Sequence, residues 1–175
     1  MPTFQETYDI IKNSVIFKKF IEENPNAELI AGFFILDFLS NDNKDSVDYK
    51  LPQGEQIYTF ELTKTNAVIL KQDRLLDTET PNQQKLTSIN PEIKIDLNEI
   101  TEIVKKKTEE NKITAKLHKI IAVLQNHEID NKNQLIWNLT CMLDQLIILH
   151  ILVSSETGEV IKFERKTMMD FIKKH

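Results

Sequence analysis

The 175-residue chain contains one cysteine and three glycines. The single cysteine, Cys141, excludes a disulfide within the chain, and its apolar surroundings predict a small buried side chain rather than a nucleophile. The three glycines, Gly32, Gly54 and Gly158, are too far apart for a phosphate-binding loop, which needs glycines at close spacing. Paired Cys and His motifs for metals are also missing. We therefore expect neither a cofactor nor a bound metal.

Positive charge is scarce as well. The chain has 22 Lys and Arg against 27 Asp and Glu, and its net charge is −5. Arginine, the residue best suited to bidentate recognition of phosphates and base edges, occurs only as Arg74 and Arg165. The densest basic run, residues 105–107, is followed by Glu109 and Glu110, which neutralise it on a helix. We therefore expect no nucleic-acid partner.

Long hydrophobic runs are missing. The most membrane-like stretch, residues 146–153, is far shorter than the ~20 residues that cross a bilayer, and His150 interrupts it. The first residues show neither the basic nor the apolar region of a secretory signal. These observations predict a cytoplasmic protein without a membrane span, unless a signal preceded the sequence given.

What remains is typical of a soluble globular protein, with 41% hydrophobic and 28% charged residues. Two capping boxes, Thr3 with Glu6 and Asp96 with Glu99, predict the starts of two helices. Apolar residues at helical spacing then predict helices over 3–23 and over 97–124, the second either bent or divided in two. A short helix over residues 167–174 is also expected.

Strand patterns fill the regions between the helices. Apolar runs and period-two alternation predict strands over 28–38, 58–62, 137–143, 146–153 and 160–165, and another that begins at Val68. Residues 137–143 also fit a helical period, so that alternative stays open. The polar residues 40–54 read as a loop, and Gly158 supplies the tight turn at residues 156–159.

Residues 77–95, which contain Pro81 and Pro91, are the only candidate linker. They divide the chain into residues 1–76 and 96–175, each of which reads helix, strand, strand, turn, strand. When the two parts are aligned, their helix caps correspond to each other. The strand opening Leu29-Ile30 then corresponds to Leu135-Ile136, and the turn at Asn66 corresponds to the turn at Gly158. The alternative is that the two parts are unrelated, because any two α+β stretches can be matched when two gaps are allowed. We expect an α+β protein of two tandem helix-plus-antiparallel-sheet units, with a short C-terminal helix.

Residues 149–161 run from an apolar strand into a turn that ends Thr-Gly-Glu-Val. This segment resembles the closing hairpin of PepSY domains, and the likeness extends over residues 96–165. The first half would then be a degenerate copy, with Asn66 in place of the glycine. The resemblance implies a small PepSY/cystatin-like module, often in tandem, that binds or inhibits peptidases and other extracytoplasmic partners and has no shared catalytic residues. A longer helical region and the missing secretory signal depart from that family.

Few residues stand out as candidates for chemistry. His118 and His127 are nine residues apart and do not share a helix face as a metal pair would. His150 is predicted to be a hydrogen-bonded core residue; the alternative is an acid/base pair with Asp144 across a cavity. The densest oxygen-rich cluster lacks the central Gly and closing Glu of a calcium loop, so we expect a solvated loop. It comprises Asp37, Asn41, Asp42, Asn43, Asp45 and Asp48.

These patterns favour a non-catalytic protein-binding or regulatory module of unknown partner, without assigned catalytic, cofactor-binding or metal-binding residues. If each sheet packs one face on a helix, its second apolar face must be covered by the other half, a second copy or a ligand. We therefore expect contact with another protein, or self-association, through apolar sheet surface. The alternative function is a small-molecule-binding or enzymatic cavity between helix and sheet, with His150 and Asp144 as its polar groups.

Overall fold

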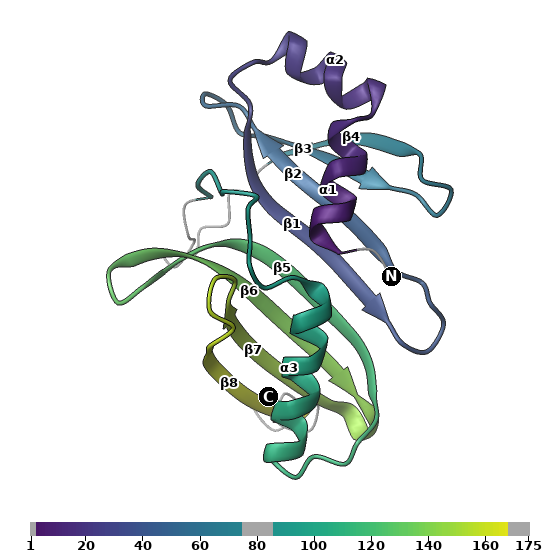
Figure 1. Cartoon of the computed structure of the whole chain (residues 1–175), viewed down its shortest axis with the longest axis vertical. Coiled ribbons are helices and arrows are strands. Elements are labelled where there is room, and N and C mark those ends of the chain that lie inside the picture. Colours follow the sequence, from purple (N-terminus) through teal and green to yellow (C-terminus); the bar gives the residue numbers. More distant parts are fainter. Residues whose placement is uncertain (1–2, 75–85, 168–175) are drawn as a thin grey trace.

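The computed structural model describes residues 3–74 and 86–167 (Figure 1). The helices are α1 (Phe4–Lys12), α2 (Val15–Glu23) and α3 (Leu97–Glu110), and a short 3-10 turn, η1, spans Asp144–Leu146. The strands are β1 (Glu28–Asp37), β2 (Lys44–Lys50), β3 (Gln56–Leu62), β4 (Val68–Arg74), β5 (Leu117–Ile129), β6 (Lys132–Leu143), β7 (Ile147–Ser154) and β8 (Val160–Thr167).

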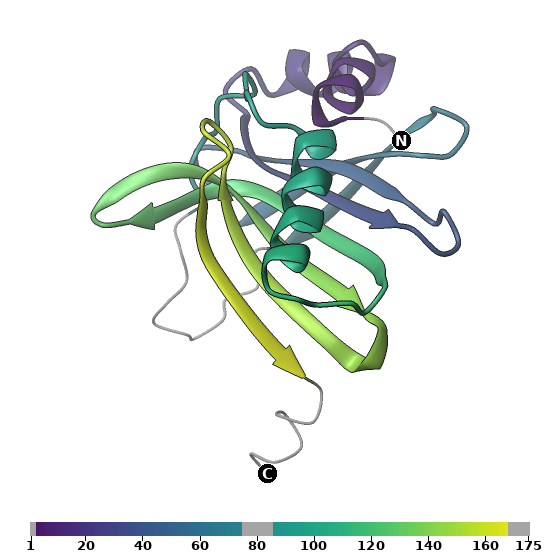
Figure 2. The same ribbon diagram turned by 60° about the horizontal axis from the view of Figure 1, so that its bottom comes forward.

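All eight strands form one antiparallel sheet in the order β4-β3-β2-β1-β5-β6-β7-β8. Each group of four consecutive strands is a meander, and the two meanders join where β1 pairs with β5. Figure 2 shows that the three helices lie over the same face of this sheet. The α+β class is thus confirmed, but the expected pair of separate sheets is one continuous sheet. Thr167 ends β8, and residues 168–175 of the expected C-terminal helix lie outside the described residues.

The helix predicted over 3–23 is two helices with a corner between them. Asn13 is the C-cap of α1, and Ser14 caps α2, because its hydroxyl accepts a hydrogen bond from the Phe17 N–H at 3.3 Å. Ser and Asn side chains bond to nearby backbone groups and so favour such breaks. The corner allows α2 to place Phe17 and Phe20 on the β2 and β3 aromatics Tyr49 and Phe60.

Two strands lie where the sequence predicted other structure. β2 occupies the polar stretch read as a loop, and it buries Val47 and Tyr49 on the helix-covered face. β5 occupies the second part of the predicted helix 97–124: Ile120 and Leu124 face the helices, whereas Ile121 and Val123 face the other side. A strand that is apolar on both faces also satisfies helical spacing, which explains the error.

The strands predicted over 28–38, 58–62, 137–143, 146–153 and 160–165 are confirmed as β1, β3, β6, β7 and β8, and β4 begins at Val68 as expected. Asn66 and Gly158 both take positive φ in the last hairpin of their meander, as the matched turns predict. The matched strand openings are wrong, since Leu29-Ile30 lie in the first strand of a meander and Leu135-Ile136 in the second.

The core centres on three rings from distant parts of the chain. Phe4 of α1 lies edge-on to Phe34 of β1 and Trp137 of β6, with ring centroids 5.9 and 6.5 Å apart. A Cβ atom at Gly32 would lie only 3.2 Å from the Phe4 ring, so glycine allows this close approach. Cys141 is fully buried as predicted, and burial raises the pKa of its thiol to about 12.

The N-termini of α1 and α3 meet at one carboxylate. Asp96 caps its own helix by accepting from the Leu97 N–H at 2.6 Å. The same side chain accepts from the Phe4 N–H at 2.7 Å and the Gln5 N–H at 3.2 Å, both in the first turn of α1. Both predicted capping boxes are present. One side chain therefore ties the helices of the two meanders together.

Within residues 3–74 and 86–167, none of the helices is both long enough and apolar enough to cross a membrane, in agreement with the expectation.

Candidate functional site

The sheet face opposite the helices carries partly exposed apolar side chains at its centre. Phe33 and Ile35 of β1 lie directly opposite Val123 and Ile121 of β5, and all four are only partly buried. We call these four residues the apolar block, and the sheet face that holds it the helix-free face. Within the described part of the chain no helix covers it (Figure 2), and its four side chains are partly exposed.

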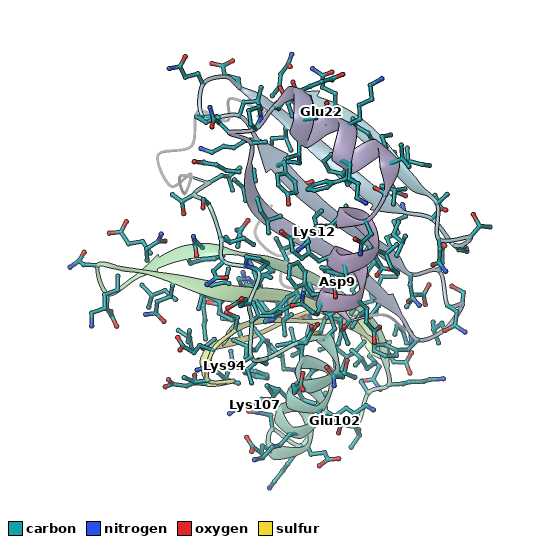
Figure 3. The ribbon with its side chains drawn as sticks, turned by 45° about the horizontal axis from the view of Figure 1, so that its top comes forward. Asp9, Lys12, Glu22, Lys94, Glu102 and Lys107 are labelled. Atoms are coloured by element: carbon teal, nitrogen blue, oxygen red, sulfur yellow. The ribbon has the colours of Figure 1, made fainter. Side chains whose placement is uncertain are left out.

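Further apolar side chains lie on the same face of the second meander, beyond the polar Asn138 and Thr140 of β6. Leu152 and Ile148 of β7 are partly buried there, and Met142 of β6 is 37% exposed. The outer sides of the helices are polar in comparison, because they present charged residues such as Asp9, Lys12 and Glu22 (Figure 3). Contiguous exposed apolar surface with a polar rim is the usual mark of an interaction site.

A hollow of about 610 Å³ adjoins the block over the first meander. Its lining comprises Phe33, Lys44, Ser46, Thr59, Glu61, Lys71, Gln72 and Asp73. Lys71 Nζ lies 2.6 Å from Glu61 Oε2, so these two charges neutralise each other. Asp48, on the same face, accepts a 2.6 Å hydrogen bond from the Thr59 hydroxyl, while burial raises the pKa of its carboxyl.

His150 lies on the helix-free face of β7, opposite Glu164 of β8. Its Nε2 is 2.8 Å from Asn138 Oδ1, and its Nδ1 is 3.9 Å from Glu164 Oε2. Burial, with smaller effects of Lys162 and Lys166, lowers the pKa of His150, and Glu164 opposes that shift. The ring is therefore neutral at pH 7. The predicted hydrogen bond of His150 is present, but the prediction of a core residue is wrong, because its side chain is 33% exposed on the helix-free face.

The acid/base pair of His150 with Asp144 is not formed. Asp144 lies in η1, where its Oδ1 contacts Nε2 of His118 and its N–H donates to the Lys116 carbonyl at 2.9 Å. The sequence placed Asp144 and His150 close in number, but the β6–β7 connection directs Asp144 toward the beginning of β5. His118 and His127 do not form a pair, since His127 is hydrogen-bonded to Gln125 at 3.1 Å.

The oxygen-rich cluster between residues 37 and 48 is dispersed. Asp37 accepts from the Ser40 hydroxyl and from the N–H groups of Ser40 and Leu39, and these hydrogen bonds lower its pKa to about 2. Asp45 and Asp48 point to opposite faces of β2. The part that was expected to be a solvated loop is thus largely β2. Among the described residues, no three His, Cys, Asp or Glu side chains form a group that could hold a metal ion.

The sequence predicted contact through apolar sheet surface, but it identified neither the residues of the block nor the hollow. A usable signal was present in the adjacent apolar residues 33–36 and 120–124, which supply both faces of β1 and β5. The hollow could not be found from the sequence, because β2 was read as a loop and its residues Lys44 and Ser46 had no assigned neighbours.

No protein-family model and no curated protein matches the chain. Its fold is similar to the crystal structure of a protein described as a putative lipoprotein from Clostridium difficile 630. The TM-score is 0.55 with 15% sequence identity, and the match covers 86% of this chain and 90% of the other. At this identity the likeness concerns the fold alone. Because the match covers 86% of this chain, it includes residues of both meanders.

Proposed function

We propose that this protein is a non-catalytic binding module and that the helix-free face receives a partner protein. The observation that carries the proposal is the apolar block: four aliphatic and aromatic side chains left partly exposed at the centre of a sheet whose other face packs against the helices. Protein interfaces have such an apolar centre within a polar rim.

Two further points support a binding role. The resemblance of residues 96–165 to PepSY domains fits a module that acts through protein contacts, and it stays a prediction because no family model matches. The likeness in fold to a putative lipoprotein leaves an extracytoplasmic location open beside the predicted cytoplasmic one. The alternative function, a cavity between helix and sheet, has less support, because Phe4, Ile100 and Trp137 fill that space and are fully buried.

The test uses a random peptide display library selected on the immobilised full chain. Selected peptides are titrated by fluorescence anisotropy against the wild type, Ile121→Lys and a control, Ile16→Lys, on the helix side. A lysine in the apolar block should weaken binding about tenfold or more, because it forces a charge into the contact. Ile16→Lys should leave affinity unchanged.

Thermal unfolding and Trp137 fluorescence establish that each variant is folded, and Phe33→Ser serves as a second variant should Ile121→Lys fail to fold. The proposal is contradicted if the selection yields no binders. It is also contradicted if the binders have equal affinity for the wild type and for the block variants Ile121→Lys and Phe33→Ser.

A further inference from the structure

The hollow beside the apolar block has a single unpaired charge. Glu61 is paired with Lys71, and the remaining acidic lining residue, Asp73, also has an interaction partner. Lys44 is exposed, and its ammonium group forms neither a hydrogen bond nor an ion pair within the described residues. A partner that covers the hollow would remove water from this ammonium group, at a cost that only a compensating anion offsets.

The position of Lys44 links this charge to the apolar block. Lys44 lies directly opposite Ile35 in the β1–β2 pairing, and Ile35 lies opposite Ile121 in the β1–β5 pairing. Neighbouring strands are about 4.8 Å apart, so the cation and the two aliphatic side chains follow one another across the sheet. Phe33 belongs both to the block and to the lining of the hollow. The apolar and cationic contacts are therefore close enough for one short peptide segment.

We infer that the partner presents an acidic side chain next to apolar ones, with its carboxylate on Lys44 and its apolar residues on the block. This inference rests on the proposed function and specifies the chemistry of the partner. Serine and threonine in the hollow favour the same ligand: Ser46 and Thr59 are small, so they leave room for a side chain to reach the Lys44 ammonium. The binding energy comes mainly from apolar contact, and the carboxylate defines which segment binds.

The experiment uses the display-selected peptides on the full chain. Asp or Glu should be enriched beside aliphatic or aromatic residues, and Lys44→Gln should weaken these peptides about five- to tenfold. Lys18→Gln, an exposed lysine of α2, is the matched control and should change nothing. Replacing the peptide's acid with lysine should restore affinity for Lys44→Glu, and higher salt should weaken the wild-type complex.

The outcomes separate the two proposals. Peptides that lose affinity with Ile121→Lys but tolerate Lys44→Gln, without acidic enrichment, overturn this inference and leave the proposed function intact. Peptides indifferent to Ile121→Lys overturn both. Loss of affinity in Lys44→Gln together with charge-swap rescue in Lys44→Glu supports the inference, since a structural effect of the substitution would not be rescued.

Discussion

At the scale of single residues, Asp45 is the polar group that fits its surroundings least well. It lies on the helix-covered face of β2, opposite Phe34 and Leu62, and only 8% of its surface is exposed. Its Oδ1 atom has no hydrogen-bond partner among the described residues. Burial raises the pKa of this carboxyl to about 6, because the charged form loses hydration.

We predict that Asp45→Asn stabilises the protein at pH 7.5 by about 1–2 kcal/mol and has little effect at pH 4. A carboxyl with a raised pKa in the folded state binds its proton more tightly there than in the unfolded chain. Folding stability contributed by this group is therefore present at low pH and is lost as pH rises through about 4 to 6. Urea unfolding of both proteins at the two pH values measures the effect; an equal difference at both would contradict it.

Residue-level predictions from the sequence succeeded where the cause is local. The capping boxes at Thr3 and Asp96 need only residues three apart, and both are formed. Cys141 is buried as its apolar neighbours indicated. His150 is hydrogen-bonded as predicted, but its partner Asn138 comes from strand register, which depends on the pairing of β6 with β7. The alternative reading, an acid/base pair with Asp144, is not formed because Asp144 contacts His118 instead.

At the scale of elements, the joint at Asp96 connects two helices that are far apart in the sequence. A carboxylate at a helix N-terminus satisfies free N–H groups and interacts favourably with the helix dipole. Asp96 does this for α3 and for α1 together. The Thr3 side chain, the cap of α1 in sequence, accepts from the Glu6 N–H of its own helix.

We predict that Asp96→Ala lowers the free energy of unfolding by about 2–3 kcal/mol, against about 1 kcal/mol for Thr3→Ala. The larger cost follows from leaving N–H groups of both helices without an acceptor. The stability cost of Asp96→Asn should lie between these two values, since asparagine retains an acceptor but loses the charge. Chemical denaturation of the three variants provides the comparison, and equal costs for Asp96→Ala and Thr3→Ala would show that the second helix gains nothing from Asp96.

Element predictions succeeded for strands with a distinct pattern and failed where the pattern was ambiguous or weak. β3 has a more buried and a more exposed face, so the alternation of apolar and polar residues is visible in its sequence. β5 has apolar residues on both faces because it lies at the centre of the sheet, and its sequence is compatible with a helix. β2 has few apolar residues, since the open face beside it is polar. The position of each strand in the sheet explains both failed predictions, and that position cannot be read from the sequence.

At the scale of the whole molecule, the β1–β5 pairing and the shared helical layer make the two meanders interdependent. The Trp137 ring of the second meander contacts Phe4 and Phe34, which come from the first part of the chain. The sequence offered a duplicated order of elements but no indication that two sheets would merge. The merger depends on the edge of β1 that remains free after β2 has paired, and β5 occupies it.

We predict that Phe60→Ala, a fully buried position in β3, shifts the unfolding transition reported by Trp137 fluorescence. The free energy of unfolding should fall by about 3–5 kcal/mol. The transitions followed by fluorescence and by far-UV circular dichroism should coincide. This follows because one cooperative unit must unfold as a whole. A Trp137 transition that stays at the wild-type midpoint would instead show that the second meander unfolds by itself.

The strand order has a consequence for synthesis on the ribosome. The first meander emerges completely before β5 is translated, and the β5 residues that pair with Gly32 to Asp37 follow roughly 80–90 residues later. Throughout that interval the nascent chain carries an unpaired strand edge beside the exposed side chains of Phe33 and Ile35. An open apolar edge is the feature that draws strands of neighbouring chains together, so the second half of this protein is also what protects the first from aggregation.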